Sequence, residues 1–404
     1  MARSGGPGSF VFGEEEKKEV MEVLEGRYLF RYGDENTDGY THKVIDFEEQ
    51  LKKTMGVDYA VATTSGTASL LASLAALGIG AGDEVIVPGY TFIASISSIM
   101  LAGAIPVLAE IDESLTIDVT KIEELITDKT KAILPVHMLG NPCKMDKIME
   151  IAKKHNLYVL EDCCQAVGAS YKGKRCGSYG DIAAFSLNIF KTISTGDGGA
   201  VITNDFGLYE RAFGYHDQGH KPRRQGVEIG NRSFVGMNMR MNELTGAVAL
   251  AQTRKLDEIL TTLRTKKAML KDMLKDLPHI SFRTLNDEGE CATLLTILFD
   301  TKDNAEKFCE KTGGRPIAYS GWHVYNNMEQ VLNKLLPAKT MNVNDRTYSK
   351  HMLPQTDDIL ERAVNISVGV VDKGLGSGYG INILSTEEEI KQVGENIRNI
   401  ILSL

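Results

Sequence analysis

The stretch FSLNIFKTISTGDGGAVITND, residues 185–205, holds a single lysine, Lys191, between an apolar run and a glycine-rich turn. The apolar runs on either side predict a strand, a loop and a second strand, which places the amine in the loop. Ser186 adds a hydroxyl, and the glycines would let the backbone turn sharply and approach a ligand. This pattern indicates amine chemistry at the loop, although a solvated surface lysine is the common alternative.

A second group of polar residues follows the apolar run YAVAT at 59–63. Ser65, Gly66 and Thr67 open a segment whose Ala and Leu residues have helical spacing. The first N–H groups of a helix point outward, the helix dipole favours negative charge, and glycine permits a close approach. The sequence therefore indicates a phosphate site here, with a plain helix N-cap as the alternative.

Two further apolar runs end in residues that could contact a planar ligand. Tyr90 and Phe92 follow the run DEVIVPG, where an aromatic ring could stack on a ligand ring or belong to the core. Glu161 and Asp162 end the run LYVLED, with Gln165 just beyond. Because a carboxylate in a buried strand is costly unless it meets a cation, these acids favour a ligand contact.

The elements that must hold these residues alternate between strand-like and helical patterns from residue 59 to residue 203. This alternation predicts an α/β fold with a mostly parallel sheet between helices. Ligands of such sheets bind beyond the carboxyl ends of the strands, which is where the polar residues fall. A long helical stretch from Met241 leads to a changed pattern, so we expect a large domain over 12–260 and a small C-terminal α/β domain over 261–404.

The composition of the chain excludes some classes of binding partner and indicates where in the cell the protein is expected. The 404-residue chain has a net charge of −9 and no long run of basic residues, which disfavours nucleic acid and anionic membranes as partners. No apolar run approaches the roughly 18 residues that cross a bilayer. Without a recognisable secretory signal, we expect a cytoplasmic protein. The six cysteines lack metal-ligand spacing and are expected to be reduced thiols, with no metal site.

Taken together, the candidate groups match one ligand, pyridoxal 5′-phosphate (PLP), which is a planar phosphorylated aldehyde. A lysine can form a Schiff base with the aldehyde, and a carboxylate can keep the ring nitrogen protonated so that the ring accepts electrons. A helix N-terminus with hydroxyls can bind the phosphate. An aromatic side chain can cover one face of the ring.

At this point the chain resembles the DegT/StrS family of PLP-dependent sugar aminotransferases, which have the aspartate aminotransferase fold, fold type I. The resemblance is carried by SGTASL, GDEVIVPGYTFIAS, EDCCQAVGASYKGKRCGSYGDIAAFS, GDGGAVITND and VGMNMRMNELTGAVALAQ, in that order. It implies a large domain built on a mostly parallel seven-stranded sheet. It also implies a homodimer with shared active sites and two small-molecule partners, an amino donor and a sugar acceptor.

The resemblance also implies a role for each matched residue. Lys191 forms the Schiff base, Asp162 pairs with the ring nitrogen, and Gln165 lies near the ring hydroxyl. The other implied cofactor contacts are Ser65, Gly66, Thr67 and Ser186 for the phosphate, Phe92 for the ring face, and Asn238, which reaches the phosphate of the neighbouring subunit.

The substrate contacts are less well defined by sequence. The motifs GWHVYNNMEQVL and MLPQTDDILERAVNISVGV resemble a longer branch of the family that includes aminotransferases acting on 8-oxo-3-deoxyoctulosonate. Trp322 and His323 lie in the first motif, although the tryptophan could instead pack a core. His220 lies in a basic loop at 216–233, for which a solvated loop is the alternative. These residues and Tyr90 are the expected substrate contacts.

The implied reaction moves an amino group from glutamate or glutamine to a keto or aldehyde sugar by ping-pong transamination. Lys191 would then serve as general base, for which burial must lower its pKa. A related PLP-dependent sugar dehydratase carries histidine at the lysine position, so Lys191 disfavours that alternative. A non-catalytic sensory or regulatory role is a third reading, for which DNA binding is disfavoured by the negative net charge.

Overall fold

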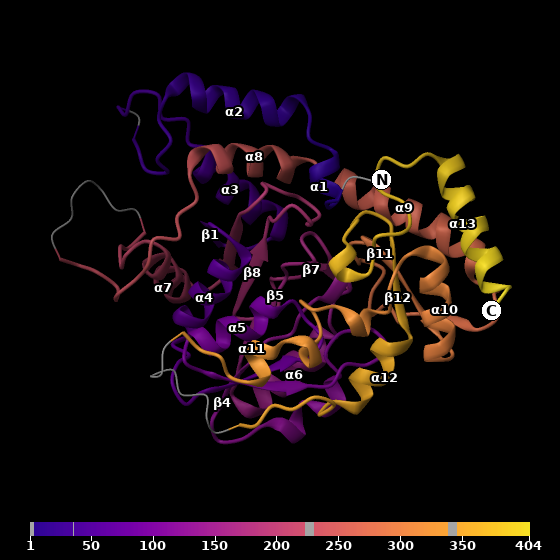
Figure 1. Cartoon of the computed structure of the whole chain (residues 1–404). Helices are drawn as coiled ribbons and strands as arrows, with labels where there is room; N and C mark the ends of the chain where they lie inside the picture. Colours follow the sequence, from indigo (N-terminus) through magenta and orange to yellow (C-terminus); the bar gives the residue numbers. More distant parts are fainter. Residues whose placement is uncertain (1–3, 35, 223–229, 338–345) are drawn as a thin grey trace.

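A seven-stranded sheet forms the centre of the protein (Figure 1). The computed structural model describes residues 4–34, 36–222, 230–337 and 346–404. All neighbouring strands are parallel except where β9 pairs antiparallel with β8 and β1, which confirms the expected mostly parallel sheet. In sheet order the strands are β1 (Tyr59–Thr63), β9 (Gly199–Thr203), β8 (Ile182–Ser186), β5 (Tyr158–Asp162), β4 (Thr130–Ile133), β2 (Glu84–Pro88) and β3 (Ile105–Ala109).

Helices enclose this sheet and explain its apolar strands. Strands β2, β3, β8 and β9 are buried along their whole length, as expected where both faces of a sheet are covered. Helix α4 packs against β8 and β9, α6 against β4 and β5, and α3 against β1 and α8. The helices around the sheet are α3 (Lys43–Met55), α4 (Gly66–Leu77), α5 (Ile93–Leu101), α6 (Met145–His155), α7 (Phe206–His216) and α8 (Glu243–Arg254).

A second, three-stranded antiparallel sheet lies beside the first (Figure 1). Its strands are β10 (Ile280–Phe282), β11 (Leu294–Phe299) and β12 (Ala363–Ser367). The long helical stretch expected from Met241 is two helices, because α8 ends before Lys255 and a second helix starts after it. The helices near this sheet are α9 (Leu256–Leu274), α10 (Lys302–Thr312), α12 (Pro354–Arg362) and α13 (Glu387–Ile401). Helix α9 runs across residue 260, and the expected domain division there stays a prediction.

The remaining elements are short. Two helices, α1 (Pro7–Phe10) and α2 (Glu14–Gly26), begin the described chain, and a third short helix, α11 (Glu329–Leu332), lies between α10 and α12 in the sequence. A small hairpin joins β6 (Ser170–Tyr171) and β7 (Lys174–Arg175). None of the helices in the described ranges combines the length and apolar character needed to cross a membrane.

Helices α3 and α8 approach each other closely at Gly246. A Cβ atom built on Gly246 would lie 2.8 Å from the backbone nitrogen of Val44 and 2.9 Å from its Cα. These are backbone atoms of a helix, so they cannot move aside as the end of a flexible side chain would. The contact between the two helices therefore requires glycine at this position.

We predict that Gly246→Ala lowers the free energy of unfolding by about 1–3 kcal/mol, because overpacking forces backbone shifts. Denaturant unfolding of the two proteins measures this difference. Gly321→Ala is the control, since a Cβ added at this exposed turn residue would meet no atom within 4 Å. Equal stability of the Gly246→Ala protein and the control would contradict the tight helix contact.

Candidate active site

A cavity of about 570 Å³ opens at the carboxyl ends of β1, β5 and β8. This is the edge of the sheet at which the sequence placed the candidate ligand contacts. Residues from the C-terminal third of the chain close its opposite side, among them Thr293, Asp372 and Leu375. The expected site residues that line the cavity are Ser65, Gly66, Thr67, Phe92, Asp162, Gln165, Ser186, Lys191, Trp322 and His323.

Lys191 lies in the loop between β8 and β9 and lines the cavity. Its backbone N–H donates to the carbonyl of Asn188 at 2.9 Å. Burial lowers the pKa of the Lys191 amine, while the nearby Cys164, Asp162 and Asp372 oppose that shift. Because only the unprotonated form of an amine can act as a nucleophile or a base, burial makes this side chain better suited to either kind of chemistry.

The N-terminal residues support this loop, which the sequence did not suggest. The N–H of Gly6 donates to the carbonyl of Ile189 at 2.8 Å, and Gly5 pairs with Val371. A Cβ on Gly6 would lie 2.3 Å from the carbonyl carbon of Phe190, so glycine is required for this approach. The glycines of SGGPGS were the available signal, but a terminal glycine cluster more often indicates a linker.

Asp162 ends β5 and lies buried at the cavity wall. One carboxylate oxygen, Oδ2, accepts a hydrogen bond from the Ser95 hydroxyl at 2.7 Å, and Oδ1 accepts one from the N–H of Cys164 at 3.0 Å. A carboxylate offers about four lone-pair sites, so it can still accept from a cationic N–H group in the cavity. Ser95 was not among the expected site residues, because its helix holds three serines, Ser95, Ser97 and Ser98, and the sequence does not indicate which of them faces a ligand.

The N-terminus of α4 forms another part of the wall. The Ser65 hydroxyl caps this helix by accepting from the N–H of Ala68 at 3.1 Å. The first N–H groups of a helix have no partner within it and are available to an anion. A Cβ on Gly66 would lie 2.7 Å from Cβ of Ser186, so a larger residue would crowd this corner. The corner thus has the features of an anion site.

Aromatic residues form the mouth of the cavity. The rings of Phe92 and Trp322 are stacked with centroids 6.3 Å apart and planes 22° apart, and the ring of His323 lies 5.4 Å from that of Phe92. Two backbone hydrogen bonds hold the segments together, from Ile93 N–H to the Trp322 carbonyl and from Thr91 N–H to the His323 carbonyl. The tertiary fold therefore joins residues far apart in the sequence.

Three expected site residues do not line this cavity. Tyr90 is fully buried in the core next to β2, so the expected substrate contact is absent at this position. His220 lies beyond α7, in the predicted basic loop, of which residues 223–229 lie outside the described residues. Asn238 is exposed and pairs with Asp217 through a backbone bridge. An exposed Asn238 outside its own cavity is compatible with contact to a neighbouring subunit.

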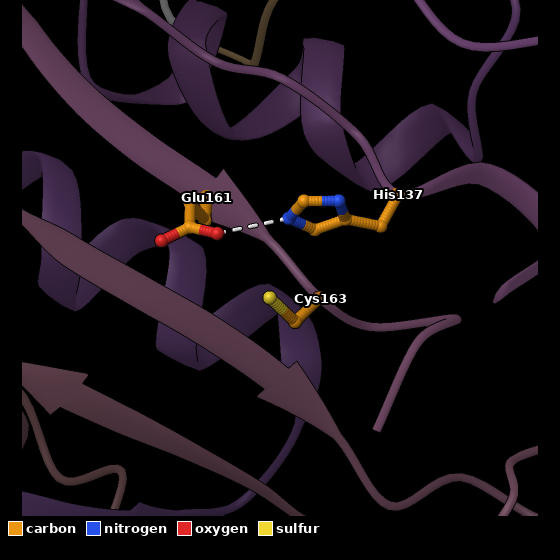
Figure 2. Close-up of side chains that lie close together, drawn as sticks. All are labelled: His137, Glu161 and Cys163. Atoms are coloured by element: carbon orange, nitrogen blue, oxygen red, sulfur yellow. Dashed lines mark hydrogen bonds and ion pairs between the residues drawn. The ribbon is translucent and has the colours of Figure 1, made fainter. Parts of the chain in front are cut away.

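The expectation that Glu161 contacts a ligand is wrong, because this residue does not line the cavity. Successive strand residues point to opposite faces, so Asp162 faces the cavity and Glu161 faces the other side. Figure 2 shows its carboxylate beside the His137 ring, with a 3.0 Å contact to Nε2. It also accepts three backbone N–H groups at 2.7–2.8 Å, from Gly177, Tyr179 and Gly180.

The three groups of Figure 2 have the composition of a metal site, since His137, Glu161 and Cys163 offer ligand atoms within 4.8 Å of one another. In this structure, however, both ring nitrogens of His137 and the carboxylate of Glu161 are engaged in hydrogen bonds. The N–H of Cys143 donates to Nδ1 of His137 at 2.9 Å, which leaves Nε2 to donate to Glu161. Burial by itself raises the pKa of Glu161, but hydrogen bonds from His137 and the backbone outweigh it and lower that pKa. The cluster is a buried support beneath the strand that carries Asp162.

The sequence profile of the DegT/DnrJ/EryC1/StrS aminotransferase family matches residues 11–371. The chain belongs to this family. It is 35% identical over 352 residues to GDP-perosamine synthase of Escherichia coli O157:H7, covering 87% of this chain and 89% of that one. It is 46% identical over 247 residues to GDP-perosamine synthase of Caulobacter vibrioides, covering 61% and 63% of the two chains.

Solved structures of other aminotransferase-like proteins share the fold of this family member. The 3-amino-5-hydroxybenzoic acid synthase superposes with a TM-score of 0.82 at 25% identity, with both chains covered completely. An aminotransferase from Psychrobacter cryohalolentis gives a TM-score of 0.79 at 29% identity and covers 100% of this chain and 99% of its own. The expected fold class, an α/β fold type I with a large mostly parallel sheet, is confirmed.

We predict that Glu161→Ala lowers the free energy of unfolding by about 3 kcal/mol or more, because it leaves buried donors without an acceptor. Chemical denaturation measures the change. Glu124→Ala is the control, because its carboxylate is exposed and forms only a surface ion pair with Lys121. A loss below about 1 kcal/mol for Glu161→Ala would contradict the supporting role of this carboxylate.

Proposed function

We propose that this protein is a PLP-dependent aminotransferase that transfers an amino group to a keto or aldehyde sugar. The observation that carries the proposal is the single cavity that joins Lys191, Asp162 and the N-terminus of α4 in a chain of the aminotransferase family. Relatives include GDP-perosamine synthases and a dTDP-3-amino-3,6-dideoxy-α-D-galactopyranose transaminase from Aneurinibacillus thermoaerophilus, 42% identical over 248 residues. These names favour a nucleotide-linked sugar over a free octulosonate as the acceptor.

The cavity residues fit the cofactor at three points. The crowded corner at Gly66, beside Ser65, Thr67 and Ser186, suits the phosphate, because a Cβ would fill it. Asp162 retains lone pairs for the protonated ring nitrogen. Phe92 offers its ring at the mouth of the cavity for stacking on the cofactor.

The orientation of Gln165 adds a fourth point of fit. Its side-chain oxygen accepts the N–H of Leu139 at 3.1 Å. The amide NH₂ group is then the part that remains as a donor, which suits the negatively charged oxygen on the cofactor ring. We therefore assign Gln165 to that oxygen.

Lys191 performs the proton transfer in this proposal. PLP, when bound, supplies an electron-withdrawing ring that makes the proton on the amino-bearing carbon of the donor acidic. Lys191 removes that proton as general base and returns one as general acid in the opposite half of the reaction. Burial keeps its amine closer to the neutral form that this role requires.

The lining of the cavity and the exposed position of Asn238 favour a homodimer with shared sites. Of the described residues that line the cavity, Lys191 is the only cation, whereas Asp162, Asp197 and Asp372 are acidic. A glutamate or glutamine donor and a cofactor phosphate bring additional negative charge. The side-chain amide of Asn238 is uncharged, but a neighbouring subunit that contributes it would add a hydrogen-bond donor for the phosphate, and the exposed position of that residue suits this role. The cytoplasmic location stays a prediction.

A dehydratase or a regulatory protein remains a competing function. Similar folds include a GDP-4-keto-6-deoxy-D-mannose-3-dehydratase from E. coli, with a TM-score of 0.80 at 23% identity, and this likeness concerns the fold alone. Lys191 favours transamination, because the proton transfer described above uses an amine.

We predict that Lys191→Ala abolishes covalent attachment of PLP and lowers amine transfer from glutamate by about 10²–10⁴-fold, since it removes the general base. After borohydride reduction, mass spectrometry should find the cofactor mass on Lys191 of the unmodified sequence. Lys131→Ala is the matched control, because that lysine is exposed on β4. Attachment at another lysine, or unchanged transfer, would contradict this function.

We predict that mixing inactive Lys191→Ala and Asn238→Ala proteins restores activity, because a mixed dimer with shared sites has one site without either substitution. Random re-association would leave about a quarter of all sites intact. Activity is measured after the subunits exchange, with each variant alone as the control. A mixture no more active than its components would show that Asn238 acts within its own subunit or not at all.

A further inference from the structure

A short hydrogen-bond chain leads from the loop around Gly374 to the cavity. The Ser320 hydroxyl donates to the carbonyl of Gly374 at 2.6 Å, and its oxygen lies 2.9 Å from Nδ1 of His323. A hydroxyl has one proton, and a carbonyl can only accept. Since Ser320 gives its proton to Gly374, it must accept one from His323, so Nδ1 carries the ring proton and Nε2 carries none.

The ring of His323 stays neutral at ordinary pH. Burial lowers the pKa of His323 to about 3, and the nearby charge of Lys191 adds to that effect. Protonation at Nε2 would place a second charge beside the lysine in a partly enclosed cavity, which is costly. One tautomer of the neutral ring is therefore present, with Nε2 as a hydrogen-bond acceptor.

The position of His323 is well defined by its neighbours. Its backbone carbonyl accepts from Thr91, and its ring packs beside Phe92. The side-chain amide of Asn327 donates to the Ser320 carbonyl at 3.0 Å, which holds the serine in place. His323 lines the cavity together with Lys191, and within the described residues its Nε2 has no hydrogen-bond partner.

An acceptor without a partner in such a wall requires a donor from the ligand, because an unsatisfied polar atom loses free energy when water is displaced. On the ring of a keto sugar, the groups that can donate such a hydrogen bond are the hydroxyls. A carbonyl or carboxylate oxygen can only accept, so it would be repelled by the Nε2 lone pair. The site thus distinguishes a sugar hydroxyl from the keto group that reacts.

We propose that Ser320 holds His323 as its Nδ1–H tautomer, and that Nε2 of His323 accepts a hydrogen bond from a ring hydroxyl of the sugar substrate. This inference rests on the proposed function and names the specificity contact of the same cavity. His323 contacts the substrate, whereas Ser320 is a positioning residue that acts through His323. The pair selects sugars that retain the hydroxyl over their deoxy analogues.

The tautomer is tested directly by ¹⁵N NMR of the histidine ring in the PLP-bound and the PLP-free protein, with the His323 signals assigned by their loss in His323→Phe. We expect protonated Nδ1 and unprotonated Nε2 across neutral pH, and a new Nε2–H population in Ser320→Ala. Ser281→Ala is the control, since that serine is exposed and distant in sequence. A protonated Nε2 in the unmodified sequence, or no change in Ser320→Ala, would overturn the positioning role.

The hydroxyl contact is tested with GDP-4-keto-6-deoxymannose and its 2-deoxy and 3-deoxy analogues, which together remove each ring hydroxyl. We expect kcat/KM to fall about 10–100-fold for one analogue, because a hydrogen bond to a buried acceptor is lost. In His323→Phe this preference should disappear. In Ser320→Ala it should weaken, with the change in KM larger than that in kcat.

The same analogue preference in His323→Phe, or no turnover of any of the three sugars, would overturn the hydroxyl contact. Amine transfer from glutamate to the cofactor is measured separately in the unmodified protein. Its absence would contradict the proposed function, whereas the NMR result for His323 does not depend on it. The two failures are therefore distinguishable.

Discussion

The free-energy cost of burying charged groups at the carboxyl ends of the strands determines how this site is built. An amine and a carboxylate, those of Lys191 and Asp162, share one partly enclosed cavity. The carboxylate is stabilised by the Ser95 hydroxyl and a backbone N–H, while burial shifts the amine toward its neutral form. Catalysis by an amine needs this compromise, because a fully solvated lysine would stay protonated and inert as a base.

At the preceding residue, Glu161, the protein itself offsets the cost of burying a carboxylate. Glu161 faces the other side of β5, where His137 and three backbone donors satisfy it completely. Asp162 keeps unused lone pairs because its side faces the cavity. The two adjacent acids of β5 therefore have different roles. Glu161 connects the loop at 177–180 to the sheet by hydrogen bonds, and these bonds stabilise the strand that presents Asp162.

Segments from distant parts of the chain complete the wall that the sheet begins. Residues 5–8 lie against the Lys191 loop, and residues 320–323 lie along the segment after β2. The Gly374 carbonyl determines the hydrogen-bonding state of Ser320 and through it that of His323. In the proposed reaction, the specificity contact thus depends on segments far apart in the sequence, whereas Lys191 is presented by one local strand-loop-strand unit.

The sequence alone determined the α/β class, the strand-loop-strand position of Lys191 and the groups at the carboxyl ends of the strands, because apolar periodicity and glycine-rich turns are local signals. Only the tertiary structure decided which of these side chains face the cavity and which face away from it. It buried Tyr90, turned Glu161 away, and brought Ser95 and the N-terminal glycines to the site. It also decided the tautomer of His323. Side-chain direction and hydrogen-bond partners arise from packing between distant segments, which no short stretch of sequence encodes.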